Sequence, residues 1–205
     1  MKGGGSNGYC VVCEEIEKVF SEIVEPVTWS QNGTKGLNML HEQITSALNE
    51  QVELEAQSSH TYLAMAVWAE THGYDGTASF LYEHAEEERM HMLKLMRFIN
   101  ERGGVAAVPP LSAPAVDYSG LEVIFRTILE HETTVTASIN AVVDQCLSLK
   151  DYTTHNFMQW YVAEQIEEEA MARKVLDKLA LVGGDHGALY LFDRDILGLV
   201  GSEDA

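Results

Sequence analysis

The sequence predicts an all-helical protein, built as a four-helix bundle with one long crossover connection and a short fifth helix at the C-terminal end. Two observations favour this fold class. Apolar residues recur every three or four positions over four long windows, and no strand-like alternation is sustained anywhere. The connections between these windows are short, then long, then short, which indicates two helical hairpins joined by a crossover.

Glycine and proline separate the predicted elements in chain order. Residues 1–36 are interpreted as an N-terminal extension, with a glycine-rich, disordered start at 1–8, a short helical stretch within 9–25 and a linker at 30–36. The main domain is predicted to span residues 37–205. Its helices are expected over residues 37–72, 75–102, 120–149, 151–182 and 186–199.

The lengths of the connections indicate how the helices are arranged. Tight turns follow the first and third of these helices, so each pair is expected to form an antiparallel hairpin. Between the pairs lies Gly103–Ser119, which contains three of the four prolines. Fully extended, its ~17 residues reach ~56 Å. The second helix, with about 27 residues, is only ~40 Å long. The loop can therefore run the length of the bundle.

Charge and composition exclude several classes of function. The chain has 13 basic and 32 acidic residues and a net charge of −19, so no nucleic-acid partner is expected, because such binding depends on basic side chains. No apolar run approaches the ~18 residues of a membrane span, so no membrane association is expected. The start MKGGGSNG does not resemble a secretory signal, and three cysteines cannot form a disulfide framework. A cytoplasmic location is expected, with an organelle as the alternative.

Each long helix carries an apolar stripe that should face the bundle interior, and polar residues interrupt every stripe near its middle. The first stripe consists of Leu48, Val52, Glu55, Ser59, Tyr62 and Ala66. The second consists of Leu81, His84, Glu88, His91, Leu95 and Phe98. The third consists of Ile128, Glu132, Val135, Ile139 and Val142. The fourth consists of Phe157, Tyr161, Gln165, Glu168, Ala172, Val175 and Leu179.

The interrupting groups all lie ~22–27 Å from their hairpin turns, hence at one level of the bundle. Buried carboxylates need protons, basic partners or metal cations, and no lysine or arginine belongs to the stripes. Glu88 and His91 form a Glu-x-x-His pair, which Glu55 and Glu132 complete as a set able to hold two metals. These ligands suit iron or manganese, and zinc is left open. A protonated or water-filled polar core is the alternative.

With these residues the chain resembles the bacterial-type non-haem ferritins, from about Leu37 to Leu199. The stretches that carry the resemblance are Leu48-Asn49-Glu50-Gln51, Glu55, Tyr62, His84-Ala85, Glu87-Glu88, His91, His131-Glu132 and the run from Gln159 to Glu169. The resemblance implies a ferritin-like fold and a homo-oligomeric shell of 24 subunits. It also implies that the protein oxidises Fe²⁺ with O₂ or peroxide and stores ferric mineral inside.

The resemblance further implies roles for individual residues. One iron would be bound by Glu55, Glu88 and His91. The second would share Glu88 as a bridge and use Glu132, Gln165 and Glu168. A third, weaker iron site would consist of Glu87, Glu164, Glu167 and Glu168. Tyr62 matches the family tyrosine beside the centre and is a candidate electron donor, as is Trp160.

Two positions depart from related families. Gln165-x-x-Glu168 stands where bacterioferritins and many di-iron enzymes have a second Glu-x-x-His. This change weakens the second metal site and fits iron that passes through. Arg89 occupies the position where bacterioferritins place their haem-ligating methionine, so no haem is expected.

Two other functions of this class of fold are kept as hypotheses. A di-iron redox enzyme, such as a rubrerythrin-like peroxidase, would favour a second Glu-x-x-His and a four-cysteine electron-transfer module, and the sequence has neither. A DNA-protecting mini-ferritin would lack the fifth helix. Cys10 and Cys13 form a lone C-x-x-C pair, which is a weak signal. The histidines other than His91, including His84, are interpreted as surface or hydrogen-bonded groups.

Overall fold

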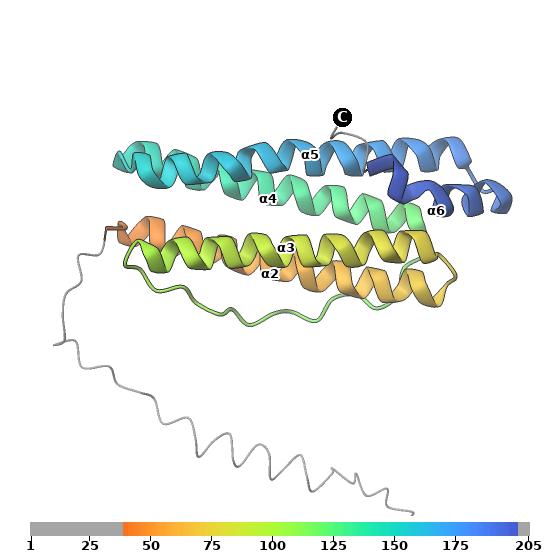
Figure 1. The fold of residues 1–205 in the computed structure, drawn as a ribbon, viewed down its shortest axis with the longest axis horizontal. Coiled ribbons are helices and arrows are strands. Elements are labelled where there is room, and N and C mark those ends of the chain that lie inside the picture. The colour runs from red at the N-terminus through yellow and green to blue at the C-terminus, as the bar shows by residue number, and fades with distance from the viewer. Residues whose placement is uncertain (1–38, 201–205) are drawn as a thin grey trace, which may run out of the picture. The chain divides into compact units, whose positions relative to one another are not determined.

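The computed structural model describes residues 39–200, which form five α-helices and no strand (Figure 1). In chain order the helices are α2 (Glu42–Thr71), α3 (Asp75–Glu101), α4 (Leu121–Leu149), α5 (Tyr152–Val182) and α6 (His186–Val200). The predicted all-helical bundle with a short C-terminal helix is confirmed. None of these helices is long and apolar enough to cross a membrane. The predicted extension over residues 1–36, including the stretch 9–25, lies outside the described residues.

The start of the first helix differs from the prediction. We expected it from residue 37, but α2 begins at Glu42. The preceding residue, His41, has an extended backbone, and its Nδ1 accepts a hydrogen bond from the Gln43 amide at 3.2 Å. The His41 side chain thus satisfies one of the free amides of the first turn, and the helix begins at the next residue. The other four helices match their predicted bounds to within one residue.

The two hairpins and the crossover arrange the four long helices. Each hairpin turn contains a residue with a left-handed backbone, Gly73 at φ 80° and Lys150 at φ 58°. The connection after α3 runs along the bundle to the start of α4 (Figure 1). It is held at three points along α2, by hydrogen bonds that join Asn49 to Ala107, Gln57 to Ser112 and Trp68 to Asp117. The crossover predicted from loop length is therefore present, and α2 packs against both α3 and α4.

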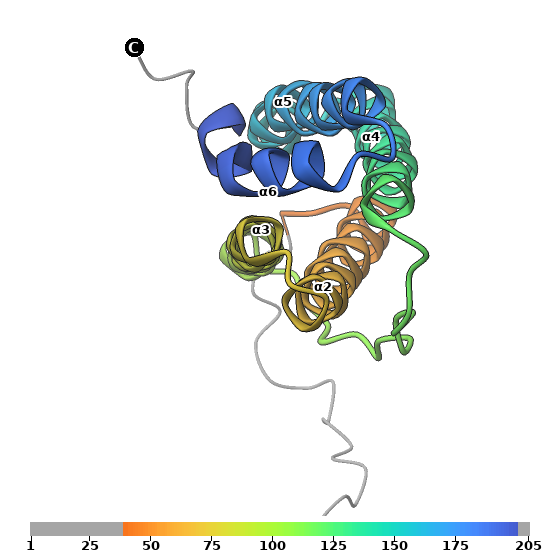
Figure 2. The same cartoon turned by 90° about the vertical axis from the view of Figure 1, so that its right-hand side faces the viewer.

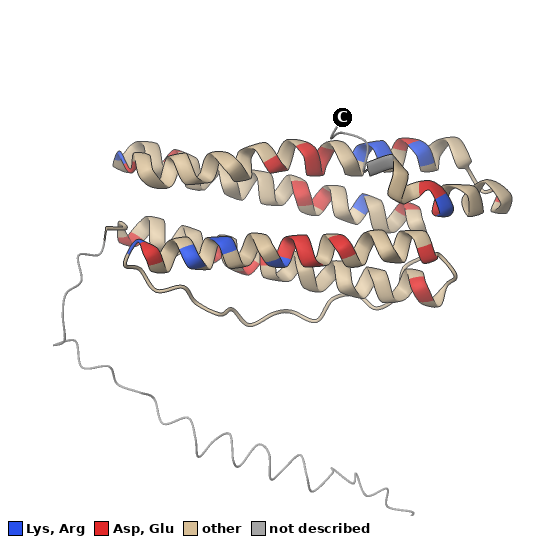
Figure 3. Ribbon diagram, viewed as in Figure 1, with Lys and Arg blue, Asp and Glu red and all other residues tan. Residues whose placement is uncertain are grey.

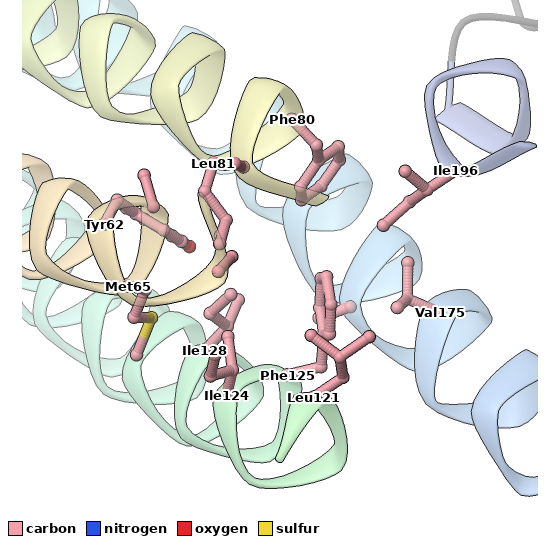
Figure 4. Packing of buried hydrophobic residues seen from close by; sticks show 14 of the residues in the cluster. Tyr62, Met65, Phe80, Leu81, Leu121, Ile124, Phe125, Ile128, Val175 and Ile196 are labelled. Carbon is pink, nitrogen blue, oxygen red and sulfur yellow. The ribbon is translucent and has the colours of Figure 1, made fainter. Parts of the chain in front are cut away.

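The bundle interior consists of two apolar clusters. One lies towards the end that carries α6 and includes Phe80, Phe125 and Ile196 (Figure 4). The other includes Ile44 and Ile139. Burying a large apolar side chain contributes about 1.5–3 kcal/mol, so the two clusters supply most of the driving force for packing the helices. The polar residues that interrupt the four stripes belong to neither cluster, apart from Tyr62 and Tyr161.

The short helix α6 lies against α3 and α5 (Figure 2). Its buried Asp193 caps the N-terminal end of α3. Asp193 Oδ2 accepts a hydrogen bond from the Gly76 amide at 3.0 Å, and Oδ1 accepts from the Thr77 amide at 2.8 Å and the Thr77 hydroxyl at 2.7 Å. A Cβ at position 76 would collide with the Asp193 carbonyl oxygen, so this close approach requires glycine. A carboxylate at this end also complements the helix dipole.

Replacing Asp193 by alanine is expected to destabilise the protein by about 2–3 kcal/mol, because buried donors of Thr77 lose a charged acceptor. Chemical denaturation would measure the loss, and hydrogen exchange would show reduced protection in α6. Asp195→Ala is the matched control, since Asp195 is exposed on the same helix and pairs with Arg194. An equal effect of the two substitutions would contradict the capping role.

Candidate metal centre

All four long helices bring polar side chains to one level of the bundle. Acidic residues gather near mid-length of α3, α4 and α5 (Figure 3). The six side chains predicted to bind the first two irons are all at most 6% exposed: Glu55, Glu88, His91, Glu132, Gln165 and Glu168. Their burial follows from the helical period, which places each of them on the stripe that also carries the apolar core residues of its helix.

The one group whose members are all buried, among the groups with ligand geometry within residues 39–200, consists of Glu55 on α2 with Glu88 and His91 on α3. One possible ligand atom from each lies within 4.8 Å of the others. His91 Nδ1 is 3.5 Å from Glu88 Oε2 and 3.9 Å from Glu55 Oε2. Glu55 Oε1 accepts a hydrogen bond from Gln51 Nε2 at 2.8 Å, which fixes the orientation of this carboxylate. The arrangement can hold one divalent cation with two carboxylates and one imidazole.

Glu132 on α4 lies beside this group and is held by two neighbours. Its Oε1 accepts a hydrogen bond from the Tyr62 hydroxyl at 2.6 Å, and its Oε2 accepts one from Gln165 Nε2 at 3.2 Å. Burial, together with the charges of nearby carboxylates, raises the pKa of Tyr62, so its phenol keeps its proton at neutral pH. The structure thus brings two predicted site residues, Tyr62 and Gln165, into direct contact with a third, Glu132.

A second group joins His84 and Glu87 on α3 to Glu168 on α5, again with ligand atoms within 4.8 Å. His84 Nδ1 lies 2.9 Å from the Phe80 carbonyl oxygen. A proton on Nδ1 would leave Nε2 free as a ligand, an arrangement typical of metal-binding histidines. Glu168 Oε2 is buried with no hydrogen-bond partner among the described residues. The predicted hydrogen-bonded character of His84 agrees with this contact, and the position of His84 on the α3 stripe, one turn before Glu88, is what brings it near Glu168.

A third group consists of Glu87, His91 and Glu164. Of the residues predicted for a third iron site, Glu87, Glu164 and Glu168 therefore lie in groups with metal-binding geometry. Glu167 is exposed and belongs to no such group among residues 39–200. Trp160 packs edge-on against the His91 ring, with the ring centroids 5.1 Å apart.

Burial makes this level of the bundle unfavourable for negative charge. Loss of solvent, with repulsion from neighbouring carboxylates, raises the pKa of Glu55 and Glu88 well above the usual range. Burial, and then the charge of Glu132, raises the pKa of Glu168 to about 9. Within residues 39–200, no lysine or arginine forms an ion pair with these groups. The site therefore holds either protons or cations, and metal binding should release protons.

Comparisons with known proteins agree with this arrangement. A family model described as a ferritin-like domain matches residues 45–182. A probable bacterial non-heme ferritin-like protein of Haemophilus influenzae is 44% identical over 158 residues, 77% of this chain and 96% of that protein. The bacterial non-heme ferritin of Campylobacter jejuni is 39% identical, with 77% and 95% covered. The open pore ferritin of Archaeoglobus fulgidus is 36% identical with a TM-score of 0.76, over 78% of this chain and 98% of that one.

The raised carboxyl pKa values predict how stability depends on pH without metal. In the unfolded chain a glutamate side chain ionises near pH 4.3. In the folded protein the Glu168 carboxyl group ionises only near its raised pKa of about 9. The folded state therefore binds more protons across this window. Its free energy of unfolding, measured with a chelator, should fall as pH rises from 5 to 9, by up to ~1.4 kcal/mol per pH unit for each such carboxyl.

Adding Zn²⁺, which is redox-inactive, should restore stability at pH 8. Glu168→Gln should make the pH slope shallower. Glu86→Gln should leave it unchanged, because Glu86 is exposed and pairs with Arg89. Metal-free stability that stays constant or rises over this window would contradict the assigned electrostatics.

Proposed function

This chain belongs to the ferritin family, and we propose that it stores iron by oxidising Fe²⁺ at the mid-bundle carboxylates and retaining the ferric product inside a shell of 24 copies. Membership of the ferritin family supports the proposed assembly into a shell and the proposed storage of ferric mineral inside it. The observation that carries the oxidation step is the buried group of Glu55, Glu88 and His91, which has ligand geometry and no basic partner from lysine or arginine among residues 39–200.

In this proposal iron is a substrate that enters as Fe²⁺. Glu55, Glu88 and His91 bind the first ion, and the protons held by the Glu55 and Glu88 carboxyl groups leave as it enters. Glu88 bridges to a second ion, which Glu132, Gln165 and Glu168 help to hold. Gln165 is a neutral ligand, so the second ion is held more weakly than it would be by the glutamate of a second Glu-x-x-His motif. Weak retention suits iron that moves on to a mineral.

Each Fe²⁺ gives one electron to O₂ or peroxide. We propose that Tyr62 can supply a further electron to the oxidant, because its hydroxyl lies 2.6 Å from Glu132 Oε1. As the phenol loses the electron, its proton can pass to Glu132 along this hydrogen bond. If Tyr62 acts as the electron donor, Glu132 is therefore the acceptor of its proton.

The oxidised ions need a route away from the centre. Burial decreases from Glu168, which is 6% exposed, through His84 at 8% to the exposed Glu87 and the half-buried Glu164. We propose that the predicted third iron site, Glu87, Glu164, Glu167 and Glu168, receives this iron and that His84 lies on the route between Glu168 and Glu87. Glu167, exposed on the same helix as Glu164, would add negative charge at this outlet. Such charge raises the local concentration of cations.

The function is tested by loading the protein with Fe²⁺ without oxygen and then admitting air. We expect oxidation faster than in buffer and hundreds of irons retained per particle. Sizing should give a particle of 24 times the 22.7 kDa chain mass. A particle that neither accelerates oxidation nor retains iron would rule out the proposal.

Glu88→Ala should slow the fast phase of oxidation by about 100-fold or more, because it removes the ligand shared by both ions. Stopped-flow absorbance of the ferric product would measure the rate, and sizing would show that assembly is intact. Glu86→Ala, two positions earlier on α3 and exposed, is the matched control and should keep the parent rate. Parent-like oxidation by Glu88→Ala would refute the ligand assignment.

A further inference from the structure

A groove follows α3 along the part that α6 leaves open. Near the start of α3, α6 is fixed over the bundle by the contact of Asp193 with Gly76 and Thr77. Further along, between residues 87 and 101 of α3 and the first turns of α5, a groove of about 670 Å³ is open to solvent. This volume falls within the range of about 300–1,000 Å³ that is typical of small-molecule sites.

Aromatic rings form one wall of the groove. Phe98 on α3 and Phe157 on α5 stack face to face, with centroids 3.8 Å apart and an interplanar angle of 7°. Trp160, one turn after Phe157, continues this wall towards His91. Flat aromatic surfaces of this kind favour the stacking of a planar ring.

Two basic side chains line the same groove, Lys94 and Arg97, one turn apart on α3. Lys94 Nζ lies 2.9 Å from the centroid of the Trp160 ring, and Arg97 is exposed. In a chain with 32 acidic and 13 basic residues, Lys94 and Arg97 form a local positive patch in the middle of an aromatic-lined groove. Neither is in an ion pair within residues 39–200, and Glu164 is the acidic group that acts electrostatically on Lys94.

The remaining charges of the groove restrict where an anion could lie. Glu87 lines it near the metal centre, and Glu101 lines it at the far end. Both would repel an anionic group. The favourable position for such a group is therefore the middle of the groove, at Lys94 and Arg97, with any attached ring against the half-buried Phe157. Phe98 is buried and stacked against Phe157, and Lys94 lies over the face of Trp160.

We propose that this groove binds a planar aromatic anion, a ring system that carries a phosphate or carboxylate group. The ring stacks on the aromatic wall, and the anionic group pairs with Lys94 and the Arg97 guanidinium, which can bind such groups with two hydrogen bonds. The site is distinct from the iron ligands, apart from its edge at Glu87 and His91. Its occupancy does not depend on iron oxidation.

The test uses metal-free, assembled full-chain protein at low ionic strength, with flavin mononucleotide as the probe. Equilibrium dialysis and quenching of flavin fluorescence should show saturable binding of one flavin per chain. Riboflavin, which has the ring without the phosphate, should bind more weakly. Arg97→Gln should weaken binding of flavin mononucleotide by about fivefold and leave riboflavin unchanged, as expected for one partly exposed charge pair. Phe157→Leu should weaken both ligands.

Arg126→Gln is the matched control, because Arg126 is an exposed arginine on α4 that pairs with Glu122, away from the groove. It should change neither affinity. The proposal is overturned if no saturable binding occurs, if the two flavins bind equally in the parent protein, or if Arg97→Gln and Arg126→Gln have the same effect. Because the assay contains no iron, failure here would leave the proposed iron chemistry untouched.

Discussion

Buried negative charge at the middle of the bundle is the constraint on which the rest of this structure depends. Four helices carry carboxylates into an interior where burial opposes ionisation. Apolar clusters on either side of this level supply the packing that keeps the helices together. Neutral donors such as Gln51, Tyr62 and Gln165 hold the carboxylates in place without neutralising them. Such an arrangement favours either protons or bound cations at this level.

Much of this arrangement could be predicted from the sequence, because helical periodicity reports directly on which face is buried. It identified the helices and placed Glu55, Glu88 and Glu132 on interior stripes. It could not resolve details that depend on local contacts. The start of α2 depends on the side-chain cap from His41, and the free ring nitrogen of His84 depends on its contact with the Phe80 carbonyl. Helical period did separate the consecutive glutamates Glu167 and Glu168, because only Glu168 falls on the interior stripe of its helix, and in the structure Glu168 is buried and Glu167 exposed.

The short helix α6 gives the two ends of the molecule different properties. At one end it covers the bundle and is anchored through Asp193, a contact with no signal in the sequence because its partners lie more than a hundred residues away. At the other end, α3 and the start of α5 form an open, aromatic groove with Lys94 and Arg97 at its middle. The metal centre lies between these two regions. One bundle thus carries an interior suited to cations and a surface groove suited to anions.

The most direct test of the central claim is anomalous diffraction from crystals of this protein soaked in Zn²⁺. This ion is redox-inactive and accepts carboxylate and imidazole ligands. Our account predicts strong anomalous peaks inside the bundle, within coordination distance of Glu55, Glu88 and His91 and of Glu88 and Glu132. Peaks confined to surface carboxylates, with the interior level empty, would contradict it.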